Sequence, residues 1–406
     1  MSSFPRFAAL VLGLTCALGL VSSQFPIAAQ QNQQRPRRVN PQGAPQATPP
    51  PAVVARQTGD EVDEGDVVRV ETQLVSVPAV VTNKSGRPLT GLRAENFVLF
   101  ENGQQQKITN FATTEAPFEI ALLLDTSGST RVDVGLIREA ANAFIDALRP
   151  GDRVAVVAFN TARQGQSVAA KVEVLSQLTG DRKQLRAAIE NLGSSNGTPF
   201  YDGLVRIADE VFREPPRQEM SGRRAIVALT DGVDSTSETD FQIARSKLSR
   251  GGLASYFIQV NTEDFVEDRL LKDCQDDGRL TLSAKQLERY RKAYFPRARP
   301  DDFTDFCQMG PFEKMQISRD IYNLARREMN EIAKASGGRN FLAASLQDAR
   351  AAFGLVATEI GTQYSLGYYP TDKTRDGKFR TIRVEVQGAP EKALVRAREG
   401  YVAPKS

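Results

Sequence analysis

Histidine and tryptophan are absent from the 406 residues of this chain, and cysteine occurs only three times. Without histidine, the chain can form neither a Ser-His-Asp nor a Cys-His nucleophile and no histidine-ligated zinc site. Acid–base chemistry would have to use Asp, Glu, Lys or Tyr, and no pair of catalytic carboxylates stands out. The absence of tryptophan excludes no chemistry. We therefore predict that the protein is not an enzyme.

An excess of one charge is also lacking, because 52 Lys and Arg residues face 49 Asp and Glu residues. No long basic stripe appears. The short cluster of Arg35, Arg37 and Arg38 lies in a Pro- and Gln-rich stretch and is typical of a solvated linker. We therefore expect no binding to nucleic acid.

A long apolar run occurs at the amino terminus, where Arg6 precedes residues 7–21. This run is shorter than the roughly 20 residues that a membrane-spanning helix needs, and small residues follow it. We therefore predict a cleaved signal peptide over residues 1–29, with a retained anchor as the alternative. The protein would then be exported to a periplasm, a cell surface or the exterior, with no stable membrane span.

Removal of the signal peptide would leave two cysteines, Cys274 and Cys307. An even number of cysteines in an exported protein favours a disulfide. Closing a loop of this length would stabilise the fold by roughly 3–4 kcal/mol if the effect is one of chain entropy. Two unpaired thiols in a loop are the alternative.

The folded part begins after a linker. Residues 30–65 are rich in Gln, Pro and Ala and contain too few large apolar residues to bury a core. Residues 66–117 show alternating apolar residues and turn signals, which predict β-strands. Residues 362–406 are again rich in predicted strands. The economical arrangement is that the two β segments pair into one small β-sandwich-like domain; a separate terminal hairpin is the alternative.

Between these β segments, residues 118–361 alternate predicted strands with amphipathic helices. Such alternation predicts an α/β fold with a doubly wound, mostly parallel sheet and right-handed crossovers. A charged stretch at about residues 262–318 interrupts the alternation, and we interpret it as an insertion before the last helices.

Two of the predicted buried strands run directly into an aspartate, Asp125 and Asp231. Ser127 and Ser129 follow the first aspartate, and Thr198 follows a polar turn before a helical pattern. In parallel α/β sheets, ligands bind beyond the carboxyl ends of the strands. Carboxylate and hydroxyl oxygens gathered there suit a hard divalent cation such as Mg²⁺. The alternative is that the aspartates cap the following helices and the serines shape a turn.

In this order and at these strand ends, the five residues resemble the metal-ion-dependent adhesion site of von Willebrand factor type A domains. Integrin inserted domains share that module. The resemblance covers roughly residues 118–360 without the insertion and implies a Rossmann-like sheet. It also implies a Mg²⁺ ion, or Mn²⁺ or Ca²⁺, held directly by the three hydroxyls. The two carboxylates would hold it directly or through water.

Such an ion keeps an open coordination position and enough positive charge to attract a carboxylate. The resemblance therefore implies a protein partner that presents Asp or Glu. The flanking motifs Gly367-Tyr368-Tyr369 and Arg398-Glu399-Gly400-Tyr401 further resemble exported bacterial proteins related to this family. The predicted function is an exported, metal-dependent adhesion module. The alternatives are an envelope scaffold without a functional metal and a metal-dependent hydrolase.

Further acidic residues surround the predicted site in the sequence. Asp202 lies on the helix after Thr198, where it would either bond a water of the site or lie at the surface. Asp234, Glu238 and Asp240 follow Asp231 closely. We expect these three to solvate a loop or to cap the next helix.

Overall fold

The computed structural model describes residues 74–113, 116–130, 134–164, 167–214, 223–270, 282–299, 306 and 309–405. The predicted signal peptide and linker lie outside these residues, as do Cys274 and Cys307. The disulfide therefore stays a prediction. Within the described residues, no helix is both long and apolar enough to cross a membrane.

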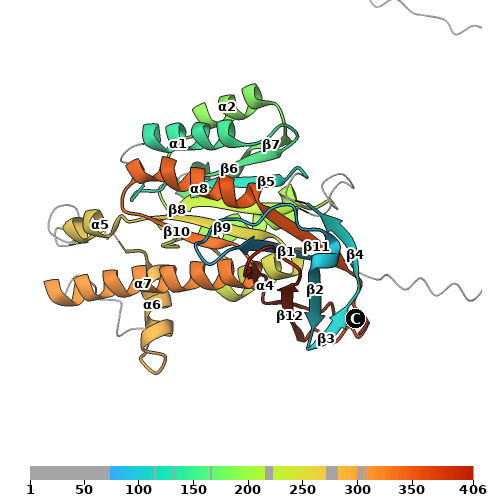
Figure 1. Cartoon of the computed structure of the whole chain (residues 1–406). Coiled ribbons are helices and arrows are strands. Elements are labelled where there is room, and N and C mark those ends of the chain that lie inside the picture. The colour runs from blue at the N-terminus through green and yellow to red at the C-terminus, as the bar shows by residue number, and fades with distance from the viewer. Residues whose placement is uncertain are drawn as a thin grey trace, which may run out of the picture. The chain divides into compact units, whose positions relative to one another are not determined.

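A six-stranded sheet, in the order β10-β9-β8-β5-β6-β7, lies at the centre of the fold (Figure 1). Only β6 and β7 pair antiparallel, and all other neighbours are parallel. The predicted α/β fold is therefore confirmed, with a mixed sheet. The strands are β5 (Glu119–Leu124), β6 (Arg153–Gln164), β7 (Ser167–Thr179), β8 (Arg224–Thr230), β9 (Ala254–Val260) and β10 (Arg339–Ala343).

Helices cover both faces of this sheet and form two separate apolar cores. Alternate residues of β5 point to opposite faces, so Leu122 belongs to one core and Leu123 to the other. This double burial explains why the central strands are continuous apolar runs. The first core packs against α1 (Val134–Ala147), α2 (Arg182–Glu190) and α8 (Ala349–Gly361). The second packs against α3 (Phe200–Arg206), α4 (Phe241–Gly251) and α7 (Pro311–Ser336).

Two further four-stranded sheets, β13-β1-β11-β4 and β14-β12-β2-β3, enclose a third apolar core. Each of these two sheets contains strands that precede the central sheet in the sequence and strands that follow it, because β1 pairs with β11 and β13, and β2 pairs with β12. The early strands are β1 (Val75–Thr82), β2 (Phe97–Glu101), β3 (Gln104–Gln106) and β4 (Ile108–Ala112). The late strands are β11 (Gln363–Tyr368), β12 (Phe379–Val386), β13 (Leu394–Ala397) and β14 (Gly400–Val402).

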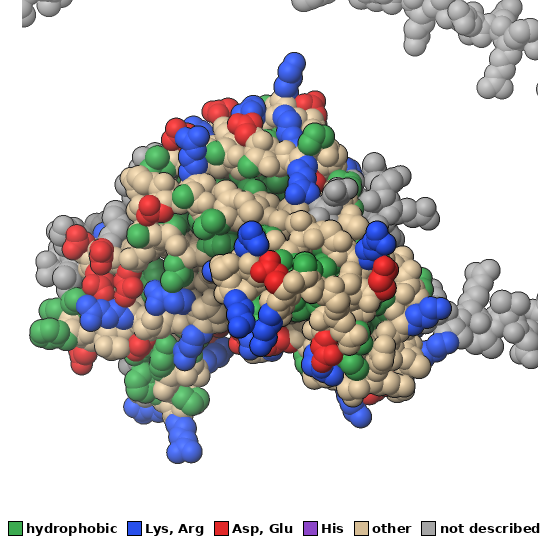
Figure 2. All heavy atoms as spheres, in the orientation of Figure 1, with side chains coloured by type: hydrophobic (Ala, Val, Ile, Leu, Met, Phe, Trp, Pro, Cys, Tyr) green, Lys and Arg blue, Asp and Glu red, His purple; other side chains and the backbone are tan. Residues whose placement is uncertain are grey.

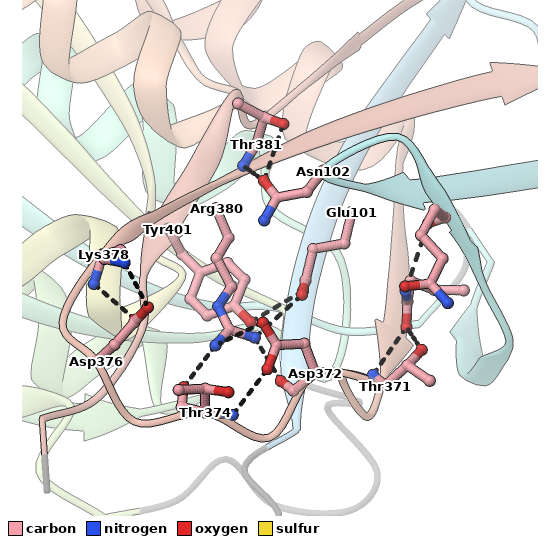
Figure 3. Close-up of polar contacts among 12 residues, drawn as sticks. Glu101, Asn102, Thr371, Asp372, Thr374, Asp376, Lys378, Arg380, Thr381 and Tyr401 are labelled. Atoms are coloured by element: carbon pink, nitrogen blue, oxygen red, sulfur yellow. Dashed lines mark hydrogen bonds and ion pairs between the residues drawn. The ribbon is translucent and has the colours of Figure 1, made fainter.

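A buried carboxylate, that of Glu101, organises this pair of sheets (Figure 3). Its Oε2 accepts hydrogen bonds from the hydroxyls of Tyr368 and Tyr401, at 2.5 and 2.9 Å. Its Oε1 lies 3.2 Å from Nη1 of Arg380, which also donates to the carbonyl of Asp372. Both tyrosines belong to the motifs noted in the sequence, so these motifs have a structural role in the β-sandwich.

Residues of the predicted insertion form a fourth apolar core, to which the start of α7 contributes. Its described helices are α5 (Glu263–Leu270) and α6 (Ala284–Tyr294), and α6 lies against α7 (Figure 1). The insertion was predicted to extend to about residue 318, before the last helices, but α7 begins earlier, at Pro311. On the face shown in Figure 2, basic and acidic side chains are interspersed.

The remaining helical segments are short. A π-helical turn, Ile207–Val211, extends α3, and 3-10 turns at Ala94–Asn96 and Leu346–Asp348 precede β2 and α8. The carboxylate of Asp240 accepts a hydrogen bond from the backbone N–H of Ile243, so it caps α4. Of the two roles expected for Asp240, the structure shows helix capping.

Candidate metal centre

Asp125 and Asp231 directly follow two neighbouring parallel strands, β5 and β8. The backbone N–H of Asp125 donates to the carbonyl of Leu229 at 3.0 Å, which continues the pairing of the two strands. Both carboxylates therefore lie at the same edge of the sheet. Both residues are almost completely buried, at 0% and 1% exposure.

Hydrogen bonds link four of the five predicted ligands in two pairs. The backbone N–H of Ser127 donates to Asp125 Oδ1 at 2.9 Å. The hydroxyl of Ser129 donates to Asp231 Oδ2 at 2.6 Å, and so joins the loop after β5 to the loop after β8. The negative charge of Asp231 also raises the pKa of Asp125.

Thr198 is held differently, through its backbone. Its N–H donates to the hydroxyl of Ser235 at 2.8 Å, and its carbonyl accepts from the N–H of Ser235 at 3.0 Å. Its segment also reaches the first loop, because the N–H of Ser195 donates to the carbonyl of Thr126 at 2.9 Å. Within the described residues, no hydrogen bond joins the side chain of Thr198 to the other four predicted ligands.

The pKa values of both aspartates are raised. Burial raises the pKa of Asp125 to about 7, and the nearby charge of Asp231 adds to this increase. Burial likewise raises the pKa of Asp231. No Lys or Arg of the described residues forms an ion pair with either aspartate. A buried pair of carboxylates without a cationic partner is an environment that favours a bound cation.

The hydroxyl oxygen of Ser127 is buried and has no hydrogen-bond partner. It lies near enough to Asp125 to lower the pKa of that carboxyl, without the geometry of a regular hydrogen bond. Buried polar atoms nearly always have a partner, so an orphaned oxygen beside two carboxylates fits a site for a cation. The described residues contain no cluster of three or more His, Cys, Asp or Glu that could hold a metal. Hydroxyls would therefore have to complete the shell, as a Ser or Thr hydroxyl binds Mg²⁺ in phosphate-binding loops.

Three threonines that the sequence analysis missed donate hydrogen bonds to the two aspartates. Thr230 Oγ1 donates to Asp125 Oδ2 at 2.6 Å, and Thr262 Oγ1 donates to Asp231 Oδ2 at 2.8 Å. Thr130 Oγ1 donates to the backbone carbonyl of Asp125 at 2.8 Å. Thr230 and Thr262 both lie at the carboxyl ends of predicted strands, and that position was the signal that could have found them.

Two neighbouring acidic residues, Asp234 and Asp202, accept hydrogen bonds from the backbone of nearby segments. Asp234 is buried, not solvated, and its Oδ2 accepts from the N–H groups of Phe200 and Tyr201 at the start of α3. The carboxylate oxygens of Asp202 accept from the N–H groups of Glu238 and Thr239, both at 2.9 Å. Asp202 therefore holds a backbone segment, a role that differs from both expectations.

Solved structures resemble parts of this chain at low identity. A proximal thread matrix protein from the mussel byssus is 13% identical with a TM-score of 0.37; the match covers 60% of this chain and 48% of that one. The VWA domain of SpRpn10 is 13% identical with a TM-score of 0.33, over 58% of this chain and 93% of that one. A von Willebrand factor type A protein from Catenulispora acidiphila is 14% identical with a TM-score of 0.39, over 82% and 75%. The match therefore spans about half the length of the mussel protein.

No curated protein matches the sequence of the chain. The family model of the von Willebrand factor type A domain matches residues 120–233. That range begins in β5, continues past β8 and contains all five predicted metal ligands. Residues 120–233 are therefore identified as a von Willebrand factor type A domain.

Proposed function

We propose that this protein is an exported interaction module that binds a carboxylate of a partner protein through a Mg²⁺-type site. Domains of the von Willebrand factor type A family are generally protein-interaction modules. The observation that carries the proposal for this chain is the orphaned hydroxyl of Ser127 beside the buried carboxylates of Asp125 and Asp231.

In this proposal, Ser127, Ser129 and Thr198 supply neutral oxygens and the two aspartates supply charge. A bound Mg²⁺ would offer an open coordination position to a carboxylate oxygen of the partner. Thr230 and Thr262 keep one oxygen of each aspartate hydrogen-bonded, which fixes the orientation of both carboxylates. Mn²⁺ and Ca²⁺ are the other candidate ions.

Calorimetric titration with MgCl₂ tests the site directly. We expect saturable binding by the wild type and a strong loss of affinity in Ser127→Ala and in Asp125→Asn. Asp146→Asn is a matched control, because Asp146 lies in an exposed ion pair with Arg186 on the outside of the domain. Identical flat traces for the wild type and Asp125→Asn would overturn the metal site and favour a scaffold.

The partner is tested by capture from an envelope extract, with and without EDTA. We expect a protein that the wild type retains in Mg²⁺ and releases in EDTA, and that Ser127→Ala does not retain. Retention that is equal in EDTA would contradict a metal-bridged contact. Metal-dependent turnover of a substrate without stable capture would instead favour a hydrolase.

A further inference from the structure

One helix of the insertion bonds to a row of backbone carbonyls next to the candidate metal centre. Residues 234–237 are here called the latch loop. The backbone carbonyls of all four residues accept hydrogen bonds from side chains of α6 or of its N-cap residue. The three donors are Ser283 to Ser235 O at 2.7 Å, Lys285 to Thr236 O at 3.2 Å and Ser237 O at 2.9 Å, and Arg289 to Asp234 O at 3.3 Å.

The latch loop in turn holds the segment that carries Thr198. Ser235 exchanges two hydrogen bonds with the backbone of Thr198, as described above. Asp234 accepts from the first N–H groups of α3, and the hydroxyl of Ser237 accepts from the N–H of Asp202 at 3.1 Å. One of these bonds joins the backbone of Ser235 to that of Thr198, and the others join side chains of the latch loop to the backbone of residues 198–202, so the position of that backbone follows the loop.

The start of α3 depends on these contacts because it has no cap of its own. Pro199 precedes the helix and provides no side-chain hydrogen bond to it. The unpaired N–H groups of a first helical turn need partners from elsewhere, and Asp234 and Ser237 provide them. A displacement of the latch loop would therefore also displace Thr198, which lies immediately before this turn.

The position of α6 itself is fixed by packing and by a half-buried ion pair. Leu287 and Tyr290 of α6 share an apolar core with Val233, which directly precedes the latch loop. Nη2 of Arg289 lies 2.6 Å from Glu328 of α7 and donates to the hydroxyl of Tyr201 at 2.8 Å. The helix is therefore anchored to α3 and α7 and is a firm support for the loop.

We propose that α6 is a positioning element of the metal centre, with Lys285 as the positioning residue that is most accessible to a test. This inference rests on the proposed metal site and adds a role for the insertion. Lys285 holds two adjacent carbonyls of the latch loop and thereby keeps Thr198 at the ligand position. Its loss should weaken Mg²⁺ binding about tenfold, the size of effect found for groups that orient metal ligands.

The test compares Lys285→Met with Lys285→Arg, which retains the charge and the donors. Lys292→Met is the matched control, since Lys292 lies on the same helix in an exposed pair with Glu288. Two measurements are made on each protein: Mg²⁺ affinity by calorimetry, and amide hydrogen exchange of residues 198–203 in EDTA. Thermal unfolding of each variant shows that the comparison is made between folded proteins.

We expect Lys285→Met to bind Mg²⁺ about tenfold more weakly and to exchange faster in residues 198–203, while Lys285→Arg recovers most of both properties. Lys292→Met should match the wild type in both. Wild-type affinity in Lys285→Met would overturn the positioning role. If the wild type itself binds no Mg²⁺, the proposed metal site fails, and equal exchange rates in Lys285→Met would then overturn the positioning of the 198–203 backbone as well.

Discussion

Thr230 Oγ1 donates a hydrogen bond of 2.6 Å to Asp125 Oδ2, so the last residue of β8 orients the carboxylate that follows β5. This bond also lowers the pKa of Asp125 and opposes the effect of burial. A residue outside the five predicted ligands therefore helps to keep the carboxylate charged.

Replacement of Thr230 by Val should weaken Mg²⁺ binding, because the substitution keeps the shape and removes the donor. The lost bond to a buried carboxylate should also cost about 1–3 kcal/mol of unfolding free energy. Calorimetry and urea denaturation measure the two effects. Thr358→Val, at an exposed position of α8, is the control, and equal affinities in both variants would contradict the orienting role of Thr230.

The metal-free protein should lose stability as the pH rises from about 4 to about 7. The folded state raises the pKa of Asp125 to about 7, from an ordinary value near 3.8, so between these values the folded state holds a proton that the unfolded state releases. The stabilisation is therefore complete at low pH and is lost as the pH passes through 7. The shift sets an upper limit of about 4 kcal/mol on the contribution of Asp125.

Urea denaturation in EDTA at several pH values measures this dependence. The stability of Asp125→Asn should depend less on pH over the same range, because the substitution removes one of the two aspartates whose pKa burial raises. Saturating Mg²⁺ should restore stability at pH 8, since the ion binds the deprotonated site of the folded state. A wild type that becomes more stable toward pH 8 in EDTA would contradict the raised pKa.

Gly232→Ala should both destabilise the fold and disturb the metal centre. Gly232 follows Asp231 with φ +76, and an added Cβ would lie 2.3 Å from Cε of Met329. The double variant Gly232→Ala, Met329→Ala should recover part of the lost Mg²⁺ affinity, because it relieves the clash and leaves only the backbone strain. No recovery in calorimetry would show that the backbone angle alone determines the loss.

Arg380→Met should destabilise the β-sandwich by about 3–5 kcal/mol, because it leaves the buried charge of Glu101 without its cationic partner. The variant Arg383→Met removes an exposed arginine of the same strand and should cost little. Urea denaturation measures both. Mg²⁺ affinity should be unchanged in both variants, since neither residue contacts the metal centre; a large change would contradict this independence.

The sequence predicted best where one local pattern determined the structure. The apolar runs before Asp125 and Asp231 predicted two parallel strands that end together, because burial on both faces requires such runs. The length of β7, from Ser167 to Thr179, could not be predicted. The strand pairs antiparallel with β6 along this length, which a short apolar pattern does not reveal.

Contacts between distant segments could not be predicted. The hydroxyls of Thr262 and Tyr322 lie 2.7 Å apart, although 60 residues separate them, and this contact connects α7 to Asp231. The start of α7 was missed because Ile317 and Ile321 pack into the core of the insertion, whose partners no periodicity in the sequence identifies.

The shared sheets have a consequence for the order of folding. Ser365 of β11 pairs with Ala112 of β4, so residues more than 250 positions apart become neighbours across the two ends of the α/β domain. Before that domain closes, the early strands lack the partners that cover Val77 and Leu99. The central sheet should therefore form first, because its formation brings the two β segments close enough to pair.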